Sequence, residues 1–295
     1  MGKKFDLDLV GEKEAEVVMF GVRLGDNAKE MLDCLRRTSW DVEFFDVDRE
    51  KNLAEGIKIA DVGDLEISSE DDITKKINGI LNQKKLPFMF SKSHLATYYA
   101  LKAFPKDVKI ISFDAHGDIK DRVKNILECR FLGKSMVPLR FEAARAEKYN
   151  STTWLRRSLE DGVDDAAIIG LRSCDEFDFD FIKKNKVLYF TPKQIRENLE
   201  EVKQNIRKFV ENSKVYLSID IDVFDPAIAP AVDYPEADGI LFPQFSEILK
   251  EVFDGKIVGI DLVEIRPMKE NDVTEFLAVK IIYEVLGLLP RAGVT

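Results

Sequence analysis

Short apolar runs alternate with amphipathic segments along most of the chain. The runs predict strands at 16–22, 57–62, 87–90, 108–113, 166–170, 187–190, 215–221 and 257–263. Apolar residues at helical spacing predict helices at 27–39, 69–81, 94–101, 192–212, 245–253 and 272–289. Only 119–160 shows no clear period. This alternation indicates an α/β fold with a mostly parallel sheet and helices on both faces. The sequence shows no internal repeat and no clear linker, so we expect one domain over 1–295.

The helix predicted at 27–39 illustrates how the pattern is used. Its apolar stripe is formed by Met31, Leu32 and Leu35 and is continued by Trp40. Residues three and four apart lie on one face of a helix, so we expect this stripe to face the sheet.

Two of the predicted strands, 108–113 and 215–221, end in charged residues. Residues two apart in an extended strand lie on the same side, so the charged side chains of each cluster can project together. A buried strand does not ordinarily end in several carboxylates unless a positive group lies between them. The residues are Asp114, His116 and Asp118 in the first cluster and Asp220 and Asp222 in the second.

His94 and Glu264 also follow predicted strands, and ligands in an α/β fold bind at the carboxyl ends of the strands. Carboxylates with a minority of imidazoles suit Mn²⁺, Mg²⁺ or Zn²⁺. The set exceeds what one tetrahedral zinc needs and suits two ions that share carboxylates and activate one water. The alternatives are acidic turns without metal and, for His94, a histidine at a helix start or in the core.

Composition narrows the class of protein. The net charge of −10 argues against non-specific binding to nucleic acid or to anionic membranes. Three cysteines without a Cys-x-x-Cys pair favour a reducing compartment and disfavour a zinc–thiolate site. No apolar run of signal-peptide length follows the first residues, and no run is long enough to span a membrane. We therefore expect a soluble, cytoplasmic protein.

The acidic motifs resemble those of the ureohydrolases, the arginase and agmatinase family. Residues 113–118 read Phe-Asp-Ala-His-Gly-Asp, which is similar to the family signature Asp-Ala-His-x-Asp. Residues 218–226 resemble its Ser-x-Asp-x-Asp-x-x-Asp-Pro signature, and 261–267 its Asp-x-Val-Glu-x-x-Pro segment. Residues 61–64 are similar to an early family stretch. The resemblance runs in order from about residue 17 to 289.

The resemblance implies a three-layer α/β/α fold with a two-manganese centre. Its ligands would be divided between two ions, with Asp114 and Asp220 bridging them. The first ion would take His94, Asp114, Asp118 and Asp220, and the second Asp114, His116, Asp220 and Asp222.

The same resemblance implies hydrolysis of a guanidinium group to urea and an amine. A hydroxide that bridges the metal ions would attack the guanidinium carbon, Asp118 would help to orient it, and Glu264 would pair with the cationic small-molecule substrate. Family members usually form homo-oligomers, as trimers or hexamers.

Departures from the family pattern concern the first ligand and the proton shuttle. The family precedes its first ligand with Gly-Gly-Asp, where this chain has Ser-Lys-Ser before His94. A Tyr-Ser-His-Gly-Thr stretch of agmatinase-like members corresponds to 149–153, so Ser151 stands among the substrate-binding residues where the shuttle histidine would be. A hydroxyl is a poor general acid, so this change would slow turnover without abolishing it.

The substrate loop also differs, because Gly-Thr-Gly-Thr-Pro becomes 231–235, Ala-Val-Asp-Tyr-Pro. Asp233 would be either an anchor for a distal amine or a solvated turn residue. Lys120 replaces an asparagine that holds the substrate carboxylate in arginases, which favours agmatine. The leading hypothesis is an agmatinase. The alternatives are a metal-binding protein that has lost catalysis and a ureohydrolase that acts on another guanidino acid or on arginine.

Overall fold

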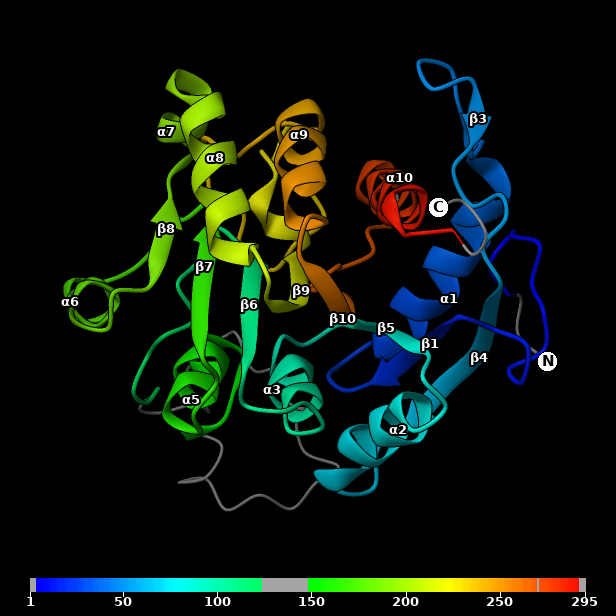
Figure 1. Ribbon diagram of the computed structural model, residues 1–295, viewed down its shortest axis with the longest axis horizontal. Coiled ribbons are helices and arrows are strands. Elements are labelled where there is room, and N and C mark those ends of the chain that lie inside the picture. The colour runs from blue at the N-terminus through cyan, green and yellow to red at the C-terminus, as the bar shows by residue number, and fades with distance from the viewer. Residues whose placement is uncertain (1–3, 124–147, 270, 292–295) are drawn as a thin grey trace.

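One eight-stranded sheet forms the middle layer of the protein (Figure 1). The computed structural model describes residues 4–123, 148–269 and 271–291. Every pairing between strands of this sheet is parallel. In sheet order the strands are β4 (Ile59–Glu66), β1 (Val17–Arg23), β5 (Leu86–Ser91), β10 (Lys256–Val263), β9 (Lys214–Asp220), β6 (Val108–Phe113), β7 (Asp165–Ile169) and β8 (Leu188–Phe190).

The strands are buried on both faces, which explains why their sequences are continuous apolar runs rather than alternating ones. Most residues of β1, β5, β6 and β9 are buried. A parallel sheet needs helices on both faces, and the two apolar clusters of the core lie on its opposite sides. The predicted α/β class is therefore confirmed.

The helices fall into two layers (Figure 1). The first cluster joins the sheet to α1 (Ala28–Thr38), α7 (Pro192–Glu197), α8 (Leu199–Val210), α9 (Phe242–Val252) and α10 (Val273–Leu288). The second joins it to α2 (Asp71–Leu81), α3 (Leu95–Leu101), α5 (Trp154–Glu160) and α6 (Glu176–Lys184). A short antiparallel pair, β2 (Phe45–Asp46) and β3 (Lys51–Asn52), lies apart from the large sheet.

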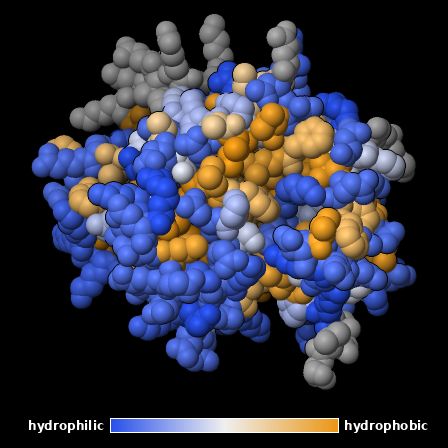
Figure 2. All heavy atoms as spheres, turned by 90° about the horizontal axis from the view of Figure 1, so that it is seen from above, coloured by the Kyte–Doolittle hydropathy of each residue, from blue (hydrophilic) through white to orange (hydrophobic). Residues whose placement is uncertain are grey.

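Figure 2 shows the molecule from the side of α7, α8 and α9. Hydrophilic side chains cover most of this face, and apolar side chains gather toward its middle. The hydrophilic part of this face is the outer surface expected of amphipathic helices that turn their apolar sides to the sheet. Within the described ranges, no helix is long and apolar enough to cross a membrane.

The structure departs from the sequence pattern at several places. The helix predicted at 192–212 is two helices, α7 and α8, because the backbone of Asn198 leaves the helical region at φ −141° and ψ 47°. Trp40 lies beyond α1 in a 3₁₀ turn, η1 (Ser39–Asp41), and is 54% exposed, so its assignment to the apolar stripe was wrong. The helix α6 was not predicted. The stretch 119–160 lies partly outside the described residues, and its described end forms η2 (Ser151–Thr153) and α5.

The topology determines where a site can form. The strands β5, β10, β9 and β6 are neighbours at the centre of the sheet. Because all of them are parallel, the segments that follow them emerge at one edge, where ligand sites of such folds lie. These segments contain the residues of the predicted metal centre.

Candidate metal centre

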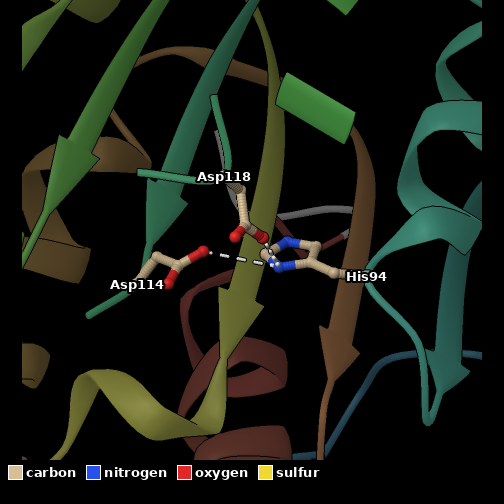
Figure 3. Close-up of side chains that lie close together, drawn as sticks. All are labelled: His94, Asp114 and Asp118. Atoms are coloured by element: carbon tan, nitrogen blue, oxygen red, sulfur yellow. Dashed lines mark ion pairs between the residues drawn. The ribbon is translucent and has the colours of Figure 1, made fainter. Parts of the chain in front are cut away.

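Carboxylates from the ends of two neighbouring strands, β6 and β9, converge on a ring nitrogen of His94, which follows β5. His94 Nδ1 lies 3.4 Å from Asp114 Oδ2, 3.2 Å from Asp118 Oδ2 and 3.3 Å from Asp220 Oδ2. Figure 3 shows how His94 points from its loop toward two of these carboxylates, Asp114 and Asp118. The imidazole is completely buried. We call His94, Asp114, Asp118 and Asp220 the inner cluster.

A relay of side chains fixes the tautomer of His94. Its Nε2 lies 2.9 Å from Ser218 Oγ, and Ser218 Oγ lies 2.7 Å from Asp261 Oδ1. The carboxylate can only accept, so the single hydroxyl proton of Ser218 goes to Asp261, and Ser218 accepts the Nε2–H of the ring. In the neutral ring, Nδ1 then carries a lone pair that faces three carboxylate oxygens.

This arrangement fits a divalent cation. His94 Nδ1 is a buried nitrogen without a hydrogen-bond partner. Burial alone would lower the pKa of His94, but the close carboxylates of Asp118 and Asp114 outweigh it and raise the pKa to about 9. A proton on Nδ1 could be donated well to only one of the three oxygens. Ligand atoms about 2.1 Å from a shared ion lie roughly 3.0–3.4 Å apart, which matches the spacing around Nδ1.

A second group lies next to the first and shares a residue with it. His116 Nδ1 lies 2.8 Å from Asp222 Oδ2 and 3.8 Å from Asp114 Oδ1. Asp114 thus turns one oxygen toward each histidine, which is the placement that a bridging carboxylate needs. Asp114, His116 and Asp222 form the outer cluster. This cluster, and His94, Asp114 and Asp118 of the inner cluster, have the close spacing of metal ligands.

Asp220 is placed less clearly than Asp114. Its Oδ2 faces His94, and its Oδ1 accepts the backbone N–H of Asp222 at 2.9 Å, much as Asp114 Oδ1 accepts that of His116 at 2.7 Å. Of the two, only Asp114 also belongs to the described group of closely spaced ligand atoms that contains His116. The bridging role of Asp220 therefore stays a prediction.

The carboxylates carry more negative charge than the site can hold unaided. Burial, followed by the charges of neighbouring carboxylates, raises the pKa of Asp114 and of Asp220 well above the ordinary value. Burial would also raise the pKa of Asp222, but His116 and a backbone N–H outweigh it and lower that pKa. A cation between the clusters would remove this repulsion.

Asp118 and Glu264 both adopt left-handed backbone conformations, with φ 47° and φ 64°. Residues other than glycine rarely adopt these backbone angles, and such backbone strain concentrates at functional sites. Glu264 Oε1 accepts the backbone N–H of His94 at 2.8 Å. Burial raises the pKa of Glu264 to about 7, although its partners oppose the shift. Its carboxylate lines the cavity above the clusters.

That cavity has a volume of about 390 Å³. His116, Asp118, Asp220 and Asp222 of the two clusters line it, together with Glu264. We call all residues of the two clusters and Glu264 the floor. The outer wall consists of the remaining lining residues, among them Lys120, Ser151, Asp175, Asp233, Tyr234 and Glu236. Ser151 thus lines the cavity in the place where the resemblance put a proton shuttle. A cavity of this size holds a small molecule.

The charges of the outer wall are partly paired. Asp233 accepts from Lys92 Nζ at 2.7 Å and from Arg266 Nη1 at 2.5 Å, so two cations already match its carboxylate. Lys120 pairs with Asp175 at 2.7 Å and with Asp178 at 3.1 Å.

Glu236 is the exception on this wall. Its Oε1 accepts from Ser173 Oγ at 2.9 Å and lies 3.9 Å from His116 Nε2. Among the described residues, no lysine or arginine pairs with it. Glu236 is therefore better placed than Asp233 to receive a distal cation.

Sequence reasoning missed several residues of the site. Ser218 lies two positions before Asp220, and Asp261 lies three positions before Glu264, both within the quoted motifs. The sequence therefore predicted that they lie near the ligands, but not that they form a hydrogen-bonded relay to His94. Glu236 follows the loop that was compared with the family. Trp154 contacts the inner cluster and gave no signal in the sequence.

The comparisons with known proteins identify a family. The sequence model described as the arginase family matches residues 15–287. The chain is 25% identical to the N(1)-aminopropylagmatine ureohydrolase of Thermococcus kodakarensis, over 98% of this chain and 96% of that protein. It is 28% identical to the guanidinobutyrase of Pseudomonas aeruginosa, over 82% and 76%.

The solved structures include a similar one, the agmatine ureohydrolase of Thermoplasma volcanium. It is 25% identical and has a TM-score of 0.80, with 98% of this chain and 94% of that chain covered. With the family match extending over nearly the whole chain, the protein belongs to the arginase family.

Proposed function

We propose that the protein is a manganese-dependent hydrolase that cleaves agmatine, with water, to putrescine and urea. The observation that carries this proposal is His94 Nδ1, a buried ring nitrogen that has no hydrogen-bond partner and faces three carboxylate oxygens. Membership of the arginase family and the similar agmatine ureohydrolase support the reaction class. The mixture of carboxylate and imidazole donors suits Mn²⁺.

Each cluster has a defined part in this chemistry. Two divalent ions, held by the inner and outer clusters, would lower the pKa of a water between them and so supply a nucleophile at neutral pH. Asp118 lies on the cavity floor, where its carboxylate can accept a hydrogen bond from that nucleophile and orient it. Glu264, in the same floor, would pair with the guanidinium cation, whose charge would keep the carboxylate ionised.

The outer wall would select the substrate. Agmatine carries an ammonium group at the end opposite its guanidinium. We assign this group to Glu236, because two cations already pair with Asp233. Ser151 would contact the substrate near the leaving amine but could not deliver a proton as a histidine does. Slow turnover with intact metal binding is the expected consequence.

The test is release of urea from agmatine by purified protein with added Mn²⁺. His116→Ala, which removes an outer-cluster ligand, is the control. We expect urea from the wild type well above that control. If the wild type releases no more urea than His116→Ala, the proposed activity is wrong. Tight agmatine binding without urea would instead indicate the alternative, a family member that has lost catalysis.

A guanidino acid is the second candidate substrate. Lys92 and Arg266 surround Asp233 with one net positive charge, which could receive a distal carboxylate instead of an amine. The guanidinobutyrase among the relatives is consistent with this possibility. Assays of 4-guanidinobutyrate and arginine beside agmatine separate the two. If kcat/KM is higher for either acid than for agmatine, that acid and not agmatine is the substrate.

Assembly into a trimer or hexamer also stays a prediction. Light scattering coupled to size-exclusion chromatography would measure it.

A further inference from the structure

Trp154 touches two predicted ligands of the inner cluster. It is the first residue of α5 and is completely buried. Its indole Nε1–H donates to Asp118 Oδ2 at 2.8 Å. Its ring stacks on the imidazole of His94, with centroids 4.4 Å apart and an interplanar angle of 28°. One side chain therefore contacts ligands that come from two different loops.

The Asp118 oxygen that accepts the hydrogen bond from the indole N–H is also the oxygen that faces His94. Asp118 Oδ2 lies 3.2 Å from His94 Nδ1 and 2.8 Å from Trp154 Nε1. A carboxylate oxygen has two lone-pair sites. The indole N–H occupies one of these sites. The other is left for an ion that would bind between Asp118 and His94. The hydrogen bond thus sets the rotation of the carboxylate, and the stacked ring limits the tilt of the imidazole.

The start of α5 is also attached to the loop that it orients. Leu155 N donates to the backbone oxygen of Asp118 at 3.2 Å, and Lys120 N donates to Thr152 O at 3.0 Å. These bonds flank Asp118, whose φ of 47° is a conformation that its surroundings must maintain. The backbone bonds hold the loop, and the indole holds the carboxylate at its end.

We propose that Trp154 is a positioning residue of the metal centre, which holds Asp118 and His94 in the geometry that binds the inner ion. The inference rests on the proposed function, because it requires that the centre bind metal. It assigns to Trp154 no contact with the substrate. The indole N–H is the group that does the positioning, and the aromatic face supports it.

The first experiment compares Trp154→Phe with the wild type. Phenylalanine keeps an aromatic face against His94 and removes the N–H donor. Partners that orient metal ligands typically contribute 10–100-fold to metal affinity, so we expect Mn²⁺ affinity, measured by calorimetry, to fall by roughly that factor. Trp40→Phe is the matched control, because Trp40 is 54% exposed and lies outside the centre. Its Mn²⁺ affinity should equal that of the wild type.

A second experiment removes only the N–H and works even if Trp154→Phe does not fold. The chain has two tryptophans, so in the Trp40→Phe background Trp154 is the only one. Its replacement there by 3-benzothienylalanine, an isostere with sulfur in place of N–H, preserves the shape. We expect the metal-free protein to melt as before and Mn²⁺ binding to weaken roughly tenfold or more. A role in packing alone predicts unchanged Mn²⁺ affinity in the isostere, which would overturn the inference.

Fluorescence provides an independent readout. In Trp40→Phe the emission comes from Trp154, and paramagnetic Mn²⁺ bound at the inner cluster should quench it with the affinity measured by calorimetry. Binding without quenching would contradict the inference. The proposed function fails if the wild type binds no Mn²⁺. If the wild type binds Mn²⁺ and both altered proteins bind it equally well, only the role of Trp154 fails.

Discussion

The floor and the outer wall of the cavity follow different rules. On the floor, each ligand candidate is held by further partners, as His94 is by Ser218 and Asp261. On the wall, Asp233 is paired with Lys92 and Arg266, while Glu236 is 42% exposed and has no lysine or arginine partner among the described residues. The side chains of the floor are thus positioned by one another and by the backbone. The wall is an arrangement of charges that different substrates could use.

This difference shows which part of the function the fold determines. The floor lies at the ends of central parallel strands, where the backbone places the ligands. Most of the wall comes from loops, which tolerate change, although Asp178 belongs to α6 and Ser151 to η2. Substitutions on the floor should therefore change metal binding, whereas substitutions on the wall should change the KM for substrate with metal binding intact.

The largest effect is expected for Asp114→Asn. Asp114 turns one oxygen to each cluster, so the substitution weakens both metal sites. Loss of a residue that only hydrogen-bonds to a metal ligand typically lowers metal affinity roughly 10–100-fold. Loss of this shared ligand should therefore lower Mn²⁺ affinity by more than about a hundredfold. Calorimetric titration measures it. Asp233→Asn on the wall is the control, and an equal loss in that variant would mean that the ligand set is wrong.

Ser218→Ala should have the next largest effect. The hydroxyl relays the hold of Asp261 on His94 Nε2, and its loss leaves the ring free to change tautomer. We expect Mn²⁺ affinity to fall roughly 10–100-fold. Ser112→Ala is a close control, because Ser112 is the cross-strand neighbour of Ser218 and is equally buried. If both serine variants bind Mn²⁺ like the wild type, the relay does not orient the ligand.

The smallest effect belongs to the wall. Glu236→Gln removes the charge assigned to the distal ammonium, and a hydrogen bond to a charged group contributes enough to change KM for agmatine by about tenfold. Mn²⁺ affinity should stay as in the wild type. Asp233→Asn should change KM less, because Lys92 and Arg266 already pair with Asp233. Steady-state kinetics on both variants decides, and a larger effect at Asp233 would reverse the assignment.

The sequence was sufficient for the sheet and for the convergence of the predicted ligands. Each of the strands β5, β6, β9 and β10 is an apolar run whose end is marked by a polar residue, which gives both the element and its functional edge. The resemblance implied that Asp114 bridges two ions. Its two oxygens lie toward His94 and His116, and the bridging role itself stays a prediction.

The remaining features depend on contacts between residues far apart in the chain. Ser218 reaches His94 across 124 positions, and Trp154 reaches Asp118 across 36. The left-handed backbone of Asp118 and Glu264 is imposed by the surrounding fold and leaves no local signature. Trp40 has the spacing of the apolar stripe but lies past the end of α1, where helical periodicity no longer applies.

If the floor binds a pair of divalent cations, these ions should stay with the protein when unbound ions are removed. Metal analysis of protein equilibrated with Mn²⁺ and then freed of unbound ions measures this. We expect two ions per chain in the wild type and fewer in Asp114→Asn. A wild-type protein that retains no Mn²⁺, or that retains as much as Asp114→Asn does, would contradict this expectation.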